Sequence, residues 1–189
     1  MEPAEFELRR RIALETRERQ RAEYASFGWH EIVDESEATA LLDTFNAAFF
    51  PNGKLCTPTP FITWDVSRLA WAQTQSSELR SLIDDLHHKC LRALKRCCVG
   101  SEPWYALENY NHPCYRVNFT NMPEDLAEWP IEILPYADPC YLLAADFSLG
   151  ILAVLRKSIT VFGGHLVSAV IEDTPLALTD VVRSGLSDA

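Results

Sequence analysis

Acidic side chains in or beside predicted strands are the residues of this chain that could do chemistry. They are Glu108, Glu132, Asp138 and Asp146. Two carboxyl groups on one face of a sheet can act as general acid and general base, provided that one of them is held protonated. Asp138 and Asp146 could equally be turn and strand-end residues whose carboxylates bind their own backbone. Both interpretations stay open, and we assign no catalytic residue from the sequence.

A second group of candidates lies on a predicted helix, where His87 and Cys90 share a face and Cys97 and Cys98 follow. Tetrahedral zinc sites usually combine paired ligands from two short-spaced segments, and the sequence offers no second pair. We therefore expect core thiols, a histidine at the rim, and neither a metal nor a cofactor.

Aromatic residues accompany the acidic ones along the predicted strands. Aromatic anchors with a charged rim are typical of tight protein interfaces. The candidate partner-binding residues are Trp104, Tyr105, Glu108, Glu132, Tyr136, Asp138 and Asp146. The alternative is that most of these rings belong to the core.

Negative charge is concentrated in the second half of the chain. The formal net charge is -10 over 189 residues; residues 1–100 carry 15 acidic and 13 basic side chains, and residues 101–189 carry 12 and 4. This distribution argues against binding to a nucleic-acid backbone. It favours a basic protein partner, or it serves solubility alone.

The composition, 48% hydrophobic and 23% charged, is typical of a globular protein, and no apolar run is long enough for a membrane span. The charged N-terminus has no apolar leader segment, so we expect a cytoplasmic location and no membrane partner. The six cysteines are then predicted to be free and mostly buried thiols.

Three helices are expected before the sheet. Residues 3–25 predict a charged helix with a thin apolar stripe, and residues 1–26 are interpreted as an arm preceding one domain over 27–189. Apolar residues recur at spacings of three and four over 36–49 and 76–98, which predicts amphipathic helices. Asp65 is a possible cap, and Ser76 or Ser77 can cap the third helix.

Nearly all remaining strand signals fall within residues 104–171, which predicts an antiparallel sheet of about six strands. Residues 61–64 read as a short edge strand or an extended loop. Gly163-Gly164 between two apolar runs predicts a tight hairpin, with residues 166–170 as its second strand. Residues 177–184 read as a short helix. Helices followed by strands predict an α+β domain with helices on one face of the sheet.

A series of short motifs runs through the predicted sheet. They are Trp104–Glu108, His112–Tyr115, Trp129-Pro130, Ile133–Pro135, Asp138, Tyr141, Ala145–Phe147, Gly150 and Val161–Gly163, with Phe45–Phe49 and Pro60–Asp65 upstream. In order and spacing the chain resembles the bacterial domain-of-unknown-function family 2716 over about residues 28–185. The resemblance implies a fold and a bacterial setting, but no catalytic residues.

The chain departs from that family's pattern at two places. Leu152–Arg156 stands where a Gly-His-Pro-Trp-like stretch is typical, and residues 135–138 lack the usual glycine. Any activity of relatives that relies on that histidine and tryptophan is therefore expected to be absent.

Together these features favour a small binding protein that is not an enzyme, most concretely an immunity protein that neutralises a basic interbacterial toxin. One alternative is a small hydrolase-like enzyme that uses Glu108, Asp138 and Asp146. Another is an oligomerising scaffold that uses the N-terminal helix. The sequence does not indicate the oligomeric state.

Overall fold

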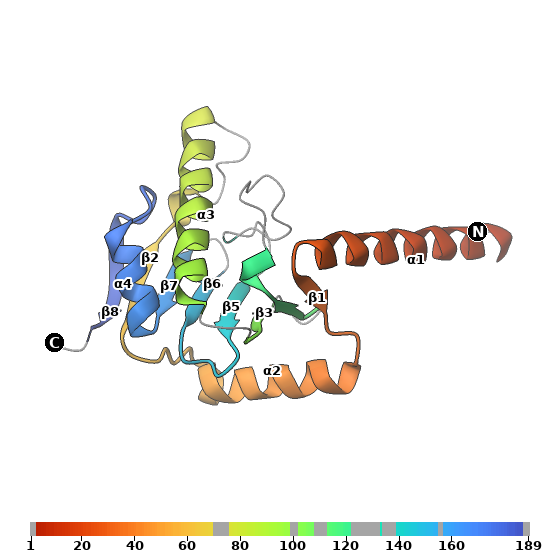
Figure 1. Cartoon of the computed structure of the whole chain (residues 1–189), viewed down its shortest axis with the longest axis horizontal. Helices are drawn as coiled ribbons and strands as arrows, with labels where there is room; N and C mark the ends of the chain where they lie inside the picture. Colours follow the sequence, from red (N-terminus) through yellow and green to blue (C-terminus); the bar gives the residue numbers. More distant parts are fainter. Residues whose placement is uncertain are drawn as a thin grey trace.

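The computed structural model describes residues 3–69, 76–98, 102–107, 113–121, 133, 139–154 and 157–186. Within these residues an eight-stranded antiparallel sheet combines with four α-helices, so the predicted α+β class is confirmed (Figure 1). The helices are α1 (Pro3–Ser26), α2 (Glu35–Phe49), α3 (Ser77–Cys97) and α4 (Gly164–Glu172). The strands are β1 (Trp29–Glu31), β2 (Phe61–Asp65), β3 (Trp104–Leu107), β4 (Tyr115–Val117), β5 (Cys140–Ala144), β6 (Gly150–Val154), β7 (Ser158–Phe162) and β8 (Asp180–Gly185).

The sheet extends well beyond residues 104–171, and its strand order is β1-β4-β3-β5-β6-β7-β2-β8. The prediction of about six strands within that range is wrong, because β1, β2 and β8 lie outside it. β2 is also not an edge strand, since it pairs antiparallel with both β7 and β8. Its four buried residues, Phe61 to Trp64, reflect this interior position.

Helices cover both faces of the sheet, which corrects the prediction that they lie on one face. α3 and α4 pack against one face in a core that includes Trp64 and Leu142. α2 packs on the other face, where the Phe45 ring lies 4.7 Å from Tyr141 and the Phe49 ring lies 5.3 Å from Phe162. Full burial of each such ring contributes about 1.5–3 kcal/mol.

A cross-strand polar pair is buried on the α2 face. Thr63 of β2 stands opposite Thr160 of β7, and their hydroxyl groups are 2.9 Å apart. Both side chains are buried, so each hydroxyl depends on the other for a hydrogen bond.

Local capping explains where the two amphipathic helices begin. Asp34 accepts hydrogen bonds from the backbone amides of Ser36 and Glu37 at the start of α2. The Ser76 hydroxyl accepts one from the Leu79 amide at 3.2 Å at the start of α3. Asp65, predicted as a possible cap, accepts a bond from the Ser67 amide at 2.7 Å and starts a short 3₁₀ turn. Such caps contribute about 1 kcal/mol each.

The segment after β7 is a helix, so the predicted hairpin and the strand over 166–170 are wrong. Gly163 precedes α4 with φ of +88°, and α4 buries residues at spacings of one, three and four against the sheet. The buried residues are Leu166, Val167, Ala169 and Val170. A short apolar run fits a buried strand and a buried helix equally well, which is why the pattern was ambiguous.

The C-terminal segment is also different from its prediction. The sequence predicts a short helix over residues 177–184, but Asp180–Gly185 is the edge strand β8. Every residue of β8 is exposed or half-buried, and β8 has a strand partner, β2, on one side only. Hydrogen bonding to β2, far away in sequence, determines its conformation.

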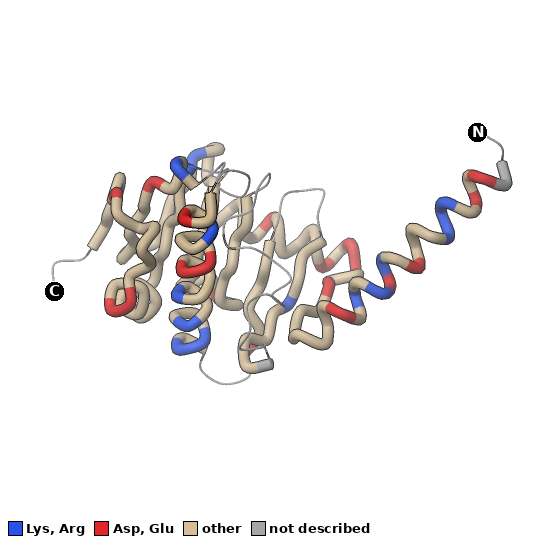
Figure 2. Tube along the Cα trace, turned by 90° about the horizontal axis from the view of Figure 1, so that it is seen from above, with Lys and Arg blue, Asp and Glu red and all other residues tan. Residues whose placement is uncertain are grey.

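α1 projects away from the rest of the molecule and contacts it near its C-terminal end (Figures 1 and 2). Its anchor is Glu31 of β1, which forms ion pairs with Arg17 at 2.8 Å and with Arg21. The Glu31 side chain is only 6% exposed. These guanidinium groups, chiefly that of Arg21, lower the pKa of Glu31 despite its burial. None of the described helices is long and apolar enough to cross a membrane.

Candidate binding cleft

A cleft of about 460 Å³ lies at one end of the α3–α4 face of the sheet. The C-terminal end of α3, α4, the start of β3 and the β5–β6 turn all contribute to it. On α4 the lining residues are His165, Ser168, Ala169 and Glu172, whose spacings of three, four and seven place them on one helical face. Three stretches of the sequence, within residues 96–104, 144–149 and 165–172, therefore form a single concave surface.

The lining has an apolar part and a charged part. Trp104, which is 5% exposed, forms the apolar part together with the buried Ala169 and the half-buried Cys97, Ala144 and Leu149. The Trp104 ring meets the Phe119 ring edge-on at 5.2 Å, which fixes its orientation. The exposed charged or titratable residues are Arg96, Glu102, Asp146, His165 and Glu172.

Asp146 is held in place by its own turn. Its carboxylate accepts a hydrogen bond from the Ser148 amide at 2.9 Å, and the hydroxyl and amide of Ser148 lower the pKa of this carboxyl group. Asp146 is therefore a fixed negative charge at neutral pH. Of the two interpretations of Asp146, the one in which its carboxylate binds its own backbone is confirmed. An ionised Asp146 is not the protonated member of an acid–base pair.

The turn that carries Asp146 is fixed from the opposite face of the sheet. Phe147 adopts a φ of +58°, and its amide donates to the Ala144 carbonyl at 2.9 Å. Its ring lies 5.9 Å from the ring of Phe49 on α2. The packing of α2 thus determines where the turn presents its carboxylate.

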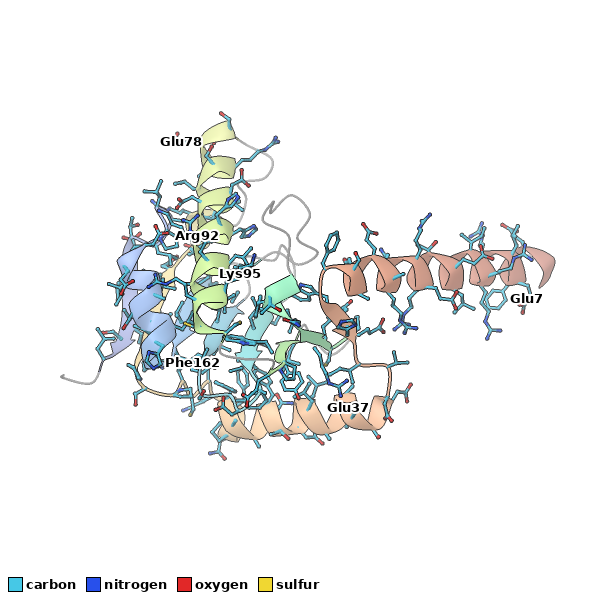
Figure 3. The ribbon with its side chains drawn as sticks, viewed as in Figure 1. Glu7, Glu37, Glu78, Arg92, Lys95 and Phe162 are labelled. Carbon is cyan, nitrogen blue, oxygen red and sulfur yellow. The ribbon has the colours of Figure 1, made fainter. Side chains whose placement is uncertain are left out.

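Basic residues of α3 are paired with the end of α4. Arg96 bonds Glu172 at 2.6 Å, and Arg92 bonds Asp173 at 2.6 Å. The bond to Glu172 raises the pKa of Arg96. Figure 3 shows Arg92 and Lys95 along α3, with Glu78 near its other end, and Figure 2 shows the basic residues of this helix in blue. The cleft's guanidinium is therefore already neutralised within the chain.

Two carboxylates of the cleft have no cationic partner within the part of the chain that the structure describes. Glu102 forms no described ion pair, and the only described bonds of Asp146 are those to its own turn. With histidine counted as neutral, the described lining carries three carboxylates and one guanidinium. The cleft is consequently net negative.

The cleft brings together two of the seven predicted partner-binding residues, Trp104 and Asp146. Tyr105 follows Trp104 on β3 and therefore faces the opposite side of the sheet, where its ring lies 6.4 Å from Phe147. The other predicted residues, Glu108, Glu132, Tyr136 and Asp138, lie outside the described residues.

Sequence reasoning missed the contributions of the helices to the cleft. Arg96 and Cys97 end the predicted third helix, but nothing in their spacing indicated a cleft. His165 and Glu172 flank the predicted strand over 166–170, so that prediction does not place them on a common helical face. The helical spacing of His165, Ser168 and Glu172 is the signal that could have revealed a shared face.

Burial makes the thiols and His87 of α3 poor candidates for chemistry. Burial raises the pKa of Cys90 to about 12 and lowers that of His87 to about 4, so both are neutral at pH 7. Desolvation likewise raises the pKa of Cys97 in the cleft. All six cysteines are free, and Cys90, Cys114 and Cys140 are buried. Among the residues with described positions, no group of three or more His, Cys, Asp or Glu could hold a metal ion.

Comparison with protein families matches residues 33–167 to the model described as "Protein of unknown function (DUF2716)". The chain belongs to the DUF2716 family. No curated protein and no solved structure matches it. In this DUF2716 protein the matched region includes α2, α3 and β2–β7, and most of the cleft. α1 and β8 lie outside the matched region.

Proposed function

We propose that this DUF2716 protein is a binding protein that neutralises a basic protein partner, most concretely as an immunity protein against a basic interbacterial toxin. The observation that carries the proposal is the cleft that joins Trp104 and Asp146 and carries a net negative charge. A well-defined concave surface with an aromatic residue and a charged rim is the kind of surface at which tight protein complexes form.

The charge distribution supports a basic partner. The second half of the chain carries eight more acidic than basic residues, and residues 122–138 contain five acidic residues and no basic one. Arg92 and Arg96 of α3 pair with two acidic residues of this half, Asp173 and Glu172, and an excess of six acidic residues remains (8 − 2). Such an excess attracts a basic partner, speeds association and selects against acidic proteins.

Growth rescue tests the proposal. The chain is co-expressed with each product of neighbouring genes in the source genome, and growth is compared with cells that express the neighbour alone. We expect one basic neighbour to be toxic and the chain to protect against it and to co-purify with it. If no neighbour binds and no toxicity is relieved, the immunity proposal is wrong.

Paired variants connect protection to the cleft. Glu102→Gln with Asp146→Asn removes both carboxylates that lack a described cation, and asparagine can keep the turn of Asp146. We expect this double variant to lose protection. Glu78→Gln is the matched control, because Glu78 is exposed in the first turn of α3, at the opposite end of that helix from Arg96.

An enzyme remains the alternative proposal, and the cleft is the observation in its favour. Asp146, ionised by its turn, would act as base or electrostatic stabiliser and would need a separate acid. A screen of hydrolase substrates at pH 7 tests this proposal. Turnover that Asp146→Asn abolishes would favour the enzyme over the binding protein.

A scaffold role for α1 is the third proposal. Four large apolar side chains of its projecting half are about half exposed: Phe6, Leu8, Ile12 and Leu14. If α1 joins copies of the chain, Leu8→Glu with Ile12→Glu should lower the mass in solution measured by light scattering. An unchanged monomer mass in both proteins would remove this role.

A further inference from the structure

We infer that the cleft receives a single lysine or arginine side chain of the partner. The inference rests on the proposed function for the identity of the partner, but the site itself is defined by its own geometry. It assigns a ligand chemistry, a basic side chain with an aliphatic stem, to the space between α3, α4 and the β5–β6 turn.

The apolar lining suits the stem of such a side chain. Ala144, Leu149 and Ala169 provide methyl and methylene surface beside the indole of Trp104. Lysine and arginine bury their three or four methylene groups along apolar surface while the charged end stays near water. A volume of about 460 Å³ is ample for one such side chain together with water.

The rim suits the charged end. Glu102 and Asp146 both lack a described cationic partner, whereas Glu172 is bonded to Arg96 at 2.6 Å. An anionic ligand would meet these two carboxylates, and the charge of Arg96, which could attract it, is already paired with Glu172. A neutral apolar ligand would leave the carboxylates without a cation. A cationic group is, of these three kinds of ligand, the one whose charge complements the two carboxylates.

Two carboxylates of the cleft, Asp146 and Glu172, are also held in place before any ligand binds. Asp146 is fixed by Ser148, and the turn is fixed by the packing of Phe147 on α2. Glu172 is fixed by Arg96. Groups that are already ordered lose little conformational entropy on binding, which favours affinity for a small charged group.

A titration with capped tripeptides, followed by amide and indole NMR signals at pH 7, tests the inference on the full chain. The probes are acetyl-Gly-Arg-Gly-amide and its lysine counterpart; the controls replace the central residue by norleucine or glutamate. We expect saturable shifts of the Trp104 indole and of the Ala145 and Ser168 amides with both basic peptides, with a dissociation constant of about 1–10 mM.

Matched variants connect the signal to the rim. Asp146→Asn should weaken binding of the arginine peptide at least about three-fold, and Glu78→Gln should leave it unchanged. The inference is overturned if the basic peptides give no saturable shift at the cleft. Equal shifts from norleucine, or unchanged binding to Asp146→Asn, overturn it too.

The outcome is distinguishable from that of the proposed function. If a basic partner protects and co-purifies while the peptides do not bind, only the assignment of the cleft fails. If the peptides bind while no neighbouring product associates, the basic-side-chain site stands and the immunity proposal fails.

Discussion

Gly163 and Gly164 stand next to each other at the start of α4, yet alanine should have opposite effects at the two positions. Gly163 has φ of +88°, and a Cβ there would lie 2.2 Å from the Leu149 Cβ and 2.8 Å from the Ser148 carbonyl oxygen. A Cβ at Gly164 would meet only the Pro60 Cγ, at 3.8 Å, which is an ordinary contact.

The expected magnitudes follow from these contacts. A side chain at a positive φ costs about 1–3 kcal/mol. Crowding against Leu149 and its backbone costs about a further 1–3 kcal/mol. Gly163→Ala should therefore lower the free energy of unfolding by about 2–6 kcal/mol. Gly164→Ala should leave that free energy unchanged or raise it by up to about 1 kcal/mol, since glycine is the poorer helix residue.

Urea unfolding of the two variants and the wild type, followed by tryptophan fluorescence, measures both values. Leu149 and Ser148 also line the cleft, so Gly163→Ala should shift their amide signals, whereas Gly164→Ala should not. The reasoning is refuted if Gly163→Ala unfolds within about 0.5 kcal/mol of the wild type. It is equally refuted if the two variants lose the same free energy.

Two further predictions concern polar pairs outside the cleft. Thr160→Val leaves the buried Thr63 hydroxyl without its 2.9 Å partner and should lower the free energy of unfolding by about 1–3 kcal/mol. The double variant Thr63→Val/Thr160→Val should approach the stability of the wild type. Equal losses of unfolding free energy in the single and double variants, measured by urea unfolding, would contradict this. Glu31→Gln should weaken the docking of α1 by about 1 kcal/mol and speed amide hydrogen exchange over residues 17–26. Glu7→Gln, in the projecting part of α1, should change neither. Unchanged exchange in Glu31→Gln would contradict the role of Glu31 as the anchor of α1. Because Arg21 and Arg17 lower the pKa of Glu31, the contribution of this ion pair to docking should be complete above the ordinary glutamate value of about 4.3 and lost as pH falls through the lower folded value.

Helices with a wide apolar stripe and a capping residue could be predicted closely. α2 and α3 begin and end within one residue of the ranges 36–49 and 76–98. Their apolar spacing and their caps at Asp34 and Ser76 are local properties, so the sequence alone contains them. The α+β fold class could be predicted from the order of helices and strands along the chain.

Pairing between distant segments could not be predicted in the same way. β2 is interior because β7 and β8 pair with it, and the exposed valines of β8 form a strand because β2 is available. One signal could have revealed the second covered face. β5 and β6 read as continuous apolar runs, Cys140–Leu143 and Ile151–Ala153, which is typical of strands that are buried on both faces.

The candidate site could be predicted only in part. Trp104 and Asp146 stood out by residue type, and both line the cleft. Arg96 and His165 did not, because the cleft exists only after α3 and α4 pack side by side on the sheet. Tyr105 was a candidate of the same kind as Trp104 but does not line the cleft, because strand alternation places it on the other face of the sheet.

The dissociation constant between this chain and a basic partner that it protects against tests the central claim most directly. Titration calorimetry would compare the wild type, the Glu102→Gln/Asp146→Asn variant and the Glu78→Gln control. The account predicts that the cleft variant binds at least about ten-fold more weakly and that the control binds like the wild type. Equal affinity of the cleft variant and the wild type would contradict it.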